Sequence, residues 1–302
     1  MKIKDSHIEV KNNAYWEDLT SGATGIYKSA MIEKLIKLHF PGPRKSLIDI
    51  GCGTCEEIIK YREILSAQKL TCTDYDAKVV EEMSKKHAKD RIDWKVADIF
   101  ALDSLNEKYD LVFLMDMIHE VYSFYGRPEQ DIAKTVDHFL GINYVNRAFE
   151  QISGIVNPGG GIILTDDVLS NEDIEVVVKI KNLETVEAVK YFLSNYPTKR
   201  INAEVVDESI MRIRSRDLNI LLTQYNKIKA QNWARWEIER LEIHEYMCPS
   251  EYKECFEKLG FITHIIIGTP ESAWHEWNAD FEVLSGLESL PDKRITLLAI
   301  KN

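Results

Sequence analysis

The chain has 302 residues, of which 45% are hydrophobic and 29% are charged, and its formal net charge is −11 at pH 7. This length allows one large α/β domain, or one domain with a sizeable insertion, and the hydrophobic share is typical of a protein with a buried core. A charge this negative opposes general attraction to the phosphate backbone of nucleic acids. The charge therefore favours a small-molecule partner over nucleic acid.

Neither a membrane span nor a secretory signal is expected. No apolar run approaches the roughly 18 residues that a span needs, and the first residues lack the apolar core of a signal peptide. The five cysteines are an odd number and are interpreted as reduced thiols rather than a disulfide framework. The sequence thus predicts a cytoplasmic protein without membrane attachment. It leaves the oligomeric state open, with a homodimer as one option.

The predicted elements begin with a helical N-terminal cover, residues 1–43, which Pro41 and Pro43 end. Strands and helices then alternate. Strands are predicted at 46–50, 70–73, 93–96, 109–115 and 162–165, and helices at 56–67, 77–88 and 131–156. Because strands that alternate with helices form parallel sheets with right-handed crossovers, this part of the chain predicts an α/β domain.

The alternation stops after residue 167. Residues 168–248 show only helical periodicity, and strand–helix order resumes with a helix at 250–259 and strands at 261–267 and 294–300. We therefore predict an α/β domain in two parts, 44–167 and 249–302. The helical insertion 168–248 would lie over the carboxyl ends of the strands, where ligands of open α/β sheets bind.

The sharpest motif is LIDIGCGTCEEI, residues 47–58, in which an apolar strand runs into a glycine turn and a helix starts at once. Gly51 and Gly53 permit a tight turn and a close approach of a ligand to the backbone. A dinucleotide fingerprint has glycine or alanine where Glu56 stands here, and Glu57 follows. Two carboxylates would repel a pyrophosphate, so the turn argues against NAD and ATP and favours a cofactor with a cationic sulfonium end.

Two acidic residues follow the next two strands. Asp74 lies 23 residues after Gly51, where a carboxylate can accept hydrogen bonds from both ribose hydroxyls. Asp98 follows the third strand, where it could accept from an adenine amino group while the N–H of Ile99 faces a ring nitrogen. Tyr75 is expected to pack beside the adenine. The alternative for each acid is a turn or helix-cap residue, and the common register of the motifs favours a nucleoside site.

In these motifs, residues 47–167 resemble class I S-adenosylmethionine-dependent methyltransferases, and the last two predicted strands extend the match. The resemblance implies a Rossmann-like, doubly wound sheet of seven strands with the last strand antiparallel, S-adenosylmethionine as cofactor and S-adenosylhomocysteine as its product. Asp49 would help to hold the methionine end of the cofactor. The implied cofactor-binding residues are Asp49, Gly51, Cys52, Gly53, Asp74, Tyr75, Asp98, Ile99 and Met115. The sequence departs from the family at Cys55, where a third glycine is common, which affects the standard cofactor geometry.

The segment LMDMIHEVYSF, residues 114–124, follows the fourth strand and would face the sulfonium and the acceptor in this fold. His119 is a candidate general base, because an ordinary histidine pKa of about 6.5 suits deprotonation of an O–H or N–H nucleophile. Asp116 and Glu120 are candidates for orienting His119 or for binding a cationic acceptor. The alternative is that His119 and Glu120 only cap and brace the next helix. All three are retained as candidate catalytic residues.

No metal site is predicted. Acids and histidines gather near the ends of the fourth and fifth strands and in the insertion, namely Asp116, His119, Glu120, Asp166, Asp167, His244 and Glu245. They show no diagnostic spacing such as H-E-x-x-H, and paired acids after a strand are usually turn residues. Cys52 and Cys55 form a C-x-x-C without a matching second pair.

The sequence therefore predicts an S-adenosylmethionine-dependent methyltransferase for a small-molecule or metabolite acceptor, methylated at oxygen or nitrogen. The reason is that the N-terminal cover and the insertion would enclose a pocket. Three alternatives stay open. The first is an enzyme of the same fold that transfers another group from S-adenosylmethionine or its decarboxylated form. The others are an RNA or protein methyltransferase and a non-catalytic, cofactor-binding regulatory protein.

Overall fold

A computed structural model describes residues 22–302, so the predicted N-terminal cover is described only from residue 22 onward. The helices are α3 (Ala23–His39), α4 (Glu56–Ile64), α5 (Ala77–Lys86), α6 (Ile118–Tyr125), α7 (His138–Gly154), α8 (Leu183–Asn195), α9 (Ser215–Lys229), α10 (Trp233–Glu239), α11 (Pro249–Lys258) and α12 (Glu271–Asp280), with 3-10 helices η1 (Ile99–Leu105) and η2 (Pro128–Gln130). The strands are β1 (Ser46–Ile50), β2 (Lys69–Asp74), β3 (Asp93–Val96), β4 (Tyr109–Met115), β5 (Val156–Asp167), β6 (Glu175–Ile180), β7 (Ala203–Val205), β8 (Ile210–Arg214), β9 (Phe261–Gly268), β10 (Phe281–Ser285) and β11 (Arg294–Lys301). No helix in this range is long and apolar enough to cross a membrane.

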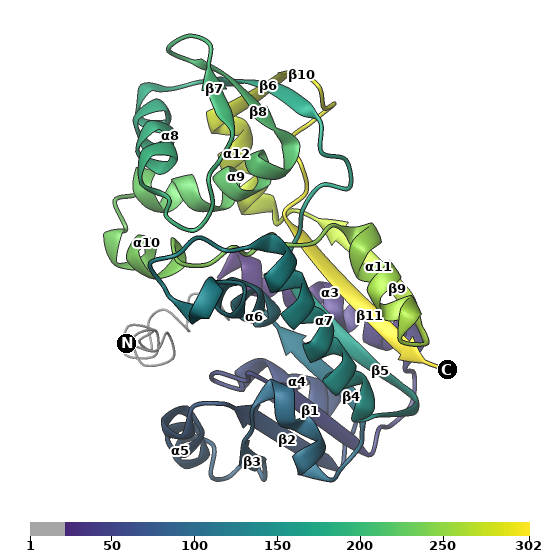
Figure 1. The fold of residues 1–302 in the computed structure, drawn as a ribbon. Coiled ribbons are helices and arrows are strands. Elements are labelled where there is room, and N and C mark those ends of the chain that lie inside the picture. The colour runs from purple at the N-terminus through teal and green to yellow at the C-terminus, as the bar shows by residue number, and fades with distance from the viewer. Residues whose placement is uncertain (1–21) are drawn as a thin grey trace.

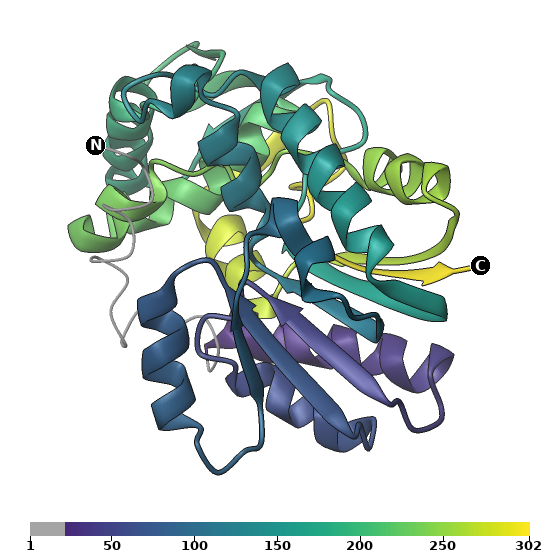
Figure 2. The ribbon, with the colours of Figure 1, turned by 60° about the horizontal axis from the view of Figure 1, so that its bottom comes forward.

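The main sheet has seven strands in the order β3-β2-β1-β4-β5-β11-β9. The strands from β3 to β5 pair in parallel, whereas β11 runs antiparallel to both β5 and β9. The predicted α/β fold with an antiparallel last strand is thereby confirmed. Helices α7 and α11 cover one face of this sheet, and α3 and α4 cover the other (Figures 1 and 2).

Burial on both faces explains why the central strands are apolar throughout. In β4, the residues from Leu111 to Leu114 are completely buried. Val112 and Leu114 belong to the core under α7, and Leu111 and Phe113 to the core under α3 and α4. A continuous apolar run is what a strand covered by helices on both sides requires.

Residues 168–248 lie between β5 and β9 as predicted, but the prediction that they are purely helical is wrong. They contain β6, β7 and β8, which form most of a second sheet with the order β10-β6-β8-β7. In β6, Val176, Val178 and Ile180 are buried and alternate with residues that are exposed or partly exposed. The sequence EVVVKI does not alternate in polarity, because Val177 is also apolar, but its run of β-branched residues is a strand signal that the helical interpretation overlooked.

The predicted range 249–302 contributes strands to both sheets. After β9, the chain leaves the main sheet and forms α12 and β10, and β10 pairs antiparallel with β6 of the second sheet. It returns to the main sheet only with β11. Figure 1 shows this second layer, with α8, α9 and α12, above the carboxyl ends of the main sheet. Pairing between segments about 100 residues apart follows from tertiary contacts, which local sequence patterns do not reveal.

Candidate active site

The glycine turn between β1 and α4 forms as the motif predicts. Gly51 and Gly53 adopt positive φ angles of 68° and 48°. A side chain at Gly51 would also come within 3.2 Å of Met117, so glycine is required for both reasons. Cys55, which stands where relatives commonly have glycine, adopts a φ of 57° as the N-cap of α4. The backbone therefore keeps the left-handed turn despite that substitution.

Asp49, the acid that precedes the turn, is buried and has no hydrogen-bond partner for either carboxylate oxygen among residues 22–302. Burial, with neighbouring Cys52 and Glu57, raises its pKa well above the usual range. An unpartnered buried carboxylate is costly unless a ligand supplies a cation or donors. The ammonium group of a methionine-like ligand would meet this need.

The two predicted nucleoside-binding acids lie at the ends of adjacent strands. Asp74 ends β2, accepts a hydrogen bond from the N–H of Asp76 (2.9 Å), and burial raises its pKa to about 7. Asp98 is exposed at the N-cap of η1, accepts from the N–H of Phe100 (3.0 Å), and precedes the buried Ile99. Since β1, β2 and β3 are neighbours in the sheet, these groups share one edge with the glycine turn. Tyr75 is exposed beside them.

A network of buried charges connects this turn with the end of β4. Lys28 of α3 lies 2.7 Å from Glu57 and 2.9 Å from Asp116. Asp116 also pairs with Arg294 of β11, which lies 2.8 Å from Asp167. Burial opposes the charged form of Asp116, but Arg294 and Lys28 more than offset it and hold its pKa well below the usual range. Asp116 is therefore anchored as a carboxylate.

Sequence reasoning missed Lys28 and Arg294. For Lys28 there was a signal, because this lysine lies on the same helical face as Ile32, Leu35 and Ile36, which are buried. A lysine on an apolar face is expected to have an acidic partner. Arg294 gave no such signal, because a charged residue at the first position of a strand does not by itself indicate a buried ion pair.

His119 is buried among carboxylates. Its Nδ1 lies 2.8 Å from Oδ1 of Asp166, and its Nε2 lies 3.6 Å from Oε2 of Glu242. Burial opposes the protonated form, but Asp166 and Glu242 outweigh this effect and raise the pKa of His119 well above the usual range. The predicted role as general base therefore requires His119 to lose a proton first, and this role stays a prediction.

A polar pocket of about 370 Å³ opens where β4, β5 and β11 meet α9, α10 and α12. All three predicted catalytic residues line it. The lining consists of Gly22, Ala23, Thr24, Asp116, His119, Glu120, Asp166, Asp167, Thr223, Asn226, Lys227, Ala230, Asn232, Arg235, Glu239, His244, Ser272, Ala273, Glu276, Lys293 and Arg294. Among residues 22–302, this lining includes no Phe, Tyr, Trp or large aliphatic side chain, so the pocket suits a hydrophilic ligand.

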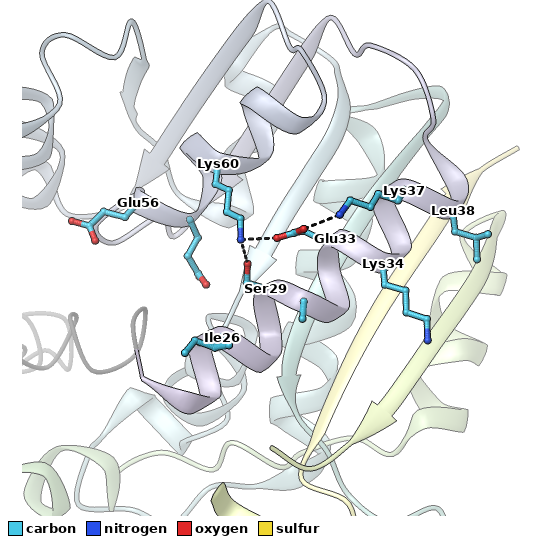
Figure 3. A pocket seen from close by; sticks show the side chains of 11 residues that line it. Ile26, Ser29, Glu33, Lys34, Lys37, Leu38, Glu56 and Lys60 are labelled. Atoms are coloured by element: carbon cyan, nitrogen blue, oxygen red, sulfur yellow. Dashed lines mark hydrogen bonds and ion pairs between the residues drawn. The ribbon is translucent and has the colours of Figure 1, made fainter. Parts of the chain in front are cut away.

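A larger groove of about 980 Å³ lies between α3 and α4 (Figure 3). Lys60 of α4 reaches across it to Glu33 (2.5 Å) and Ser29 (2.8 Å) of α3, and Lys37 pairs with Glu33 (3.0 Å). None of its lining residues is a predicted site residue. The polar pocket is therefore the candidate acceptor site.

Within residues 22–302, two groups of side chains bring three possible metal ligands within 4.8 Å of one another: the thiols of Cys52, Cys55 and Cys72, and the side chains of His119, Glu242 and His244. The sequence analysis named His119 and His244 but not Glu242. His119 lies more than 100 positions before Glu242 and His244, so no local sequence spacing indicates that these three side chains meet.

Comparison with known proteins agrees with this geometry. Residues 47–125 match a family model described as a methyltransferase domain. A polyamine aminopropyltransferase of Saccharolobus islandicus (strain L.S.2.15 / Lassen #1) is 27% identical over 161 residues, which are 52% of this chain and 50% of that protein. The chain thus spans about half the length of the curated relatives it matches.

Two solved structures share the fold at low sequence identity. The N-methyltransferase NodS of Bradyrhizobium japonicum WM9 in complex with S-adenosylhomocysteine matches with a TM-score of 0.50 and 10% identity, covering 98% of this chain and 96% of that one. The plantazolicin methyltransferase BpumL, in complex with a pentazolic desmethyl analogue and S-adenosylhomocysteine, matches with a TM-score of 0.51 and 10% identity, covering 99% and 92%.

The chain therefore shares the fold of solved methyltransferases, and residues 47–125 are similar to a methyltransferase domain. The resemblance found in the motifs is confirmed. The matched region is a methyltransferase domain, and both solved structures hold S-adenosylhomocysteine, the product of the cofactor S-adenosylmethionine. The unpartnered Asp49 and the acids at the ends of β2 and β3 fit that cofactor.

Proposed function

We propose that the chain transfers a methyl group from S-adenosylmethionine to an oxygen or nitrogen atom of a small hydrophilic molecule bound in the polar pocket. The observation that carries this proposal is the position and lining of the pocket. It lies at the carboxyl ends of β4 and β5, and Lys28 links its wall residue Asp116 to Glu57 beside the glycine turn. Its volume of about 370 Å³ is within the range of small-molecule sites.

The cofactor is expected to lie across the ends of β1, β2 and β3. Asp49 would hold the ammonium group of its methionine end, and Asp74 would accept hydrogen bonds from its ribose hydroxyls. Asp98 and the N–H of Ile99 would hold the adenine. The backbone of the glycine turn would line the methionine end, and Met115 would face the sulfur from the end of β4. In this arrangement the sulfonium methyl points toward the ends of β4 and β5.

The pocket would act mainly by alignment. The bound sulfonium supplies an activated methyl group, so holding the acceptor atom in line with the breaking C–S bond accounts for much of the acceleration. Charged groups of both signs line the pocket, including Glu120, Lys227, Arg235 and Lys293. Such a lining favours an acceptor that carries several hydrogen-bonding groups over an apolar or aromatic one.

Aminopropyl transfer is a second candidate, which the name of the curated relatives favours. That reaction uses decarboxylated S-adenosylmethionine, so nothing on the protein needs to hold a cofactor carboxylate. In this chain the buried Lys28 lies 2.7 Å from Glu57 beside the glycine turn, and we expect it to interact with the cofactor carboxylate in addition to Glu57 and Asp116. Methyl transfer from the carboxylated cofactor is therefore favoured.

Two experiments test the proposal. Calorimetric titration with S-adenosylmethionine, S-adenosylhomocysteine and decarboxylated S-adenosylmethionine, with NAD as control, is expected to show binding of the first two and none of NAD. The protein is then incubated with a panel of hydrophilic acceptors, and the nucleoside product is identified by mass spectrometry. S-adenosylhomocysteine supports methyl transfer, and methylthioadenosine supports aminopropyl transfer. Cofactor binding without either product on a broad panel would favour a regulatory protein.

A further inference from the structure

We propose that His119, Glu242 and His244 bind a divalent transition-metal ion such as Zn²⁺ on the wall of the polar pocket. Their ligand atoms lie within 4.8 Å of one another. Glu242 is completely buried, His119 is buried, and His244 is partly exposed. Two imidazoles and one carboxylate are a ligand set of catalytic zinc sites, which keep a further position open for water or substrate.

The distances fit a shared ion. A single carboxylate oxygen, Oε2 of Glu242, lies 3.6 Å from Nε2 of His119 and 3.3 Å from Nε2 of His244. Both distances exceed the range of about 2.7–3.2 Å that direct N–H···O bonds prefer. Two ligands that each lie about 2.0–2.1 Å from a tetrahedral zinc ion are separated by about 3.3–3.4 Å. Glu242 is thus at about the ligand spacing from both histidines, and all three ligand atoms lie within 4.8 Å of one another.

Asp166 orients the first histidine. Its Oδ1 lies 2.8 Å from Nδ1 of His119, and its Oδ2 accepts from the backbone N–H of the same residue (3.2 Å). A metal-bound histidine commonly donates its other ring N–H to a carboxylate, which fixes the ring and leaves the second nitrogen to the metal. On the second histidine, the amide of Gln224 lies 3.3 Å from Nδ1 of His244. Ligation by His244 requires the amide oxygen of Gln224 to face Nδ1, a half-turn from its orientation here.

The ion would be accessible from the acceptor side. His119 and His244 both line the polar pocket, so the open coordination position faces the space assigned to the acceptor. An acceptor hydroxyl bound there would release its proton to water more readily. Its oxygen would then attack the methyl carbon as the C–S bond breaks, and the electron pair would stay on sulfur. This role rests on the proposed function, whereas the site itself rests only on the side-chain geometry.

Two other features could retain metal and must be separated from this site. The thiols of Cys52 and Cys55, in the glycine turn, lie within 4.8 Å of the thiol of Cys72 in β2. On the outer part of the fold, the rings of His39 and His264 lie 3.8 Å apart. Both provide matched control variants.

The experiment measures metal rather than turnover. The 302-residue protein is stripped with a chelator, reloaded with zinc chloride and desalted, and zinc per chain is counted by plasma mass spectrometry. We expect one zinc ion per chain in the wild type and in the controls Cys72→Ser and His264→Ala. His244→Ala and Glu242→Gln should retain far less zinc after desalting, because we expect the loss of a ligand to lower zinc affinity by at least about tenfold.

Two further measurements keep the result decisive. Calorimetry with S-adenosylhomocysteine checks that each variant still folds its cofactor site. Cobalt substitution of the wild type should give visible ligand-field bands without a sulfur-to-cobalt charge-transfer band. The proposal is overturned if the folded wild type retains no zinc, if Glu242→Gln and His244→Ala retain it as tightly, or if Cys72→Ser abolishes it. Because no acceptor is involved, loss of this proposal leaves the methyl-transfer proposal standing, and the reverse also holds.

Discussion

Lys28 of α3 and Asp116 at the end of β4 form an ion pair of 2.9 Å, although 88 residues separate them in the sequence. Burial disfavours the charge on Lys28, yet Asp116 and Glu57 keep its pKa above the usual value. The pair connects the helix that covers one face of the sheet to the strand end that borders the polar pocket. Four testable predictions start from this relationship and from the acids around it.

Replacing Lys28 with methionine should lower the free energy of unfolding by about 3 kcal/mol, because it leaves the carboxylates of Asp116 and Glu57 without their shared cation. Urea denaturation measures this change. The control is Lys60→Met, which removes a half-exposed partner of Glu33 and should cost about 1 kcal/mol or less. Equal effects of the two substitutions would contradict the assignment of Lys28 as a buried bridge.

Replacing Asp74 with alanine should weaken S-adenosylmethionine binding by at least about tenfold, since the ribose hydroxyls lose a charged acceptor. Isothermal titration calorimetry measures the affinity. Asp76→Ala is the matched control, because Asp76 caps α5 by accepting from the N–H of Lys78 (2.8 Å). It should reduce stability by about 1 kcal/mol and leave the affinity unchanged. An unchanged affinity in a folded Asp74→Ala variant would refute the ribose assignment.

Cofactor affinity should depend on pH near neutrality. Burial raises the pKa of Asp74 to about 7, so this carboxyl is mostly protonated below that pH in the free protein. Ribose hydroxyls donate to the ionised form, so binding must remove the proton at low pH. Affinity should therefore fall about tenfold between pH 8 and pH 6. The raised pKa of Asp49 acts in the same direction. An Asp74→Asn variant should lose most of this dependence, and a flat wild-type profile would contradict the prediction.

Replacing His119 with glutamine should reduce turnover while cofactor affinity stays nearly intact. His119 lines the polar pocket, whereas the acids proposed to bind the cofactor lie at the ends of β1, β2 and β3. Single-turnover kinetics and calorimetry separate the two quantities. The glutamine amide can still donate a hydrogen bond to the buried carboxylate of Asp166, so the variant should lose less stability than an alanine variant would. Full activity in this variant would return His119 to a purely structural role.

The positions of the residues proposed to bind the cofactor could be predicted from the sequence because the signals for them are local. The strand–turn–helix at residues 47–58 fixes the glycine turn within a few residues, and Asp74 and Asp98 each follow directly from a strand. Parallel strands linked by right-handed crossovers bring such ends to one edge of the sheet. Local motifs therefore placed Asp74 and Asp98 beside the glycine turn, and the family resemblance added Asp49.

The polar pocket depends on contacts between distant segments, which no local sequence pattern indicates. Lys28 meets Asp116, Arg294 meets Asp167, and His119 meets Glu242 only once α3, β11 and the segment after α10 have packed against the ends of β4 and β5. The pairing of β10 with β6 is equally non-local. Helix caps and turns are decided by neighbouring residues, whereas burial of charge depends on what the rest of the chain brings to the same place. The sequence by itself thus determined the glycine turn and the strand ends beside it, and the tertiary structure decided the pocket and the charges on its walls.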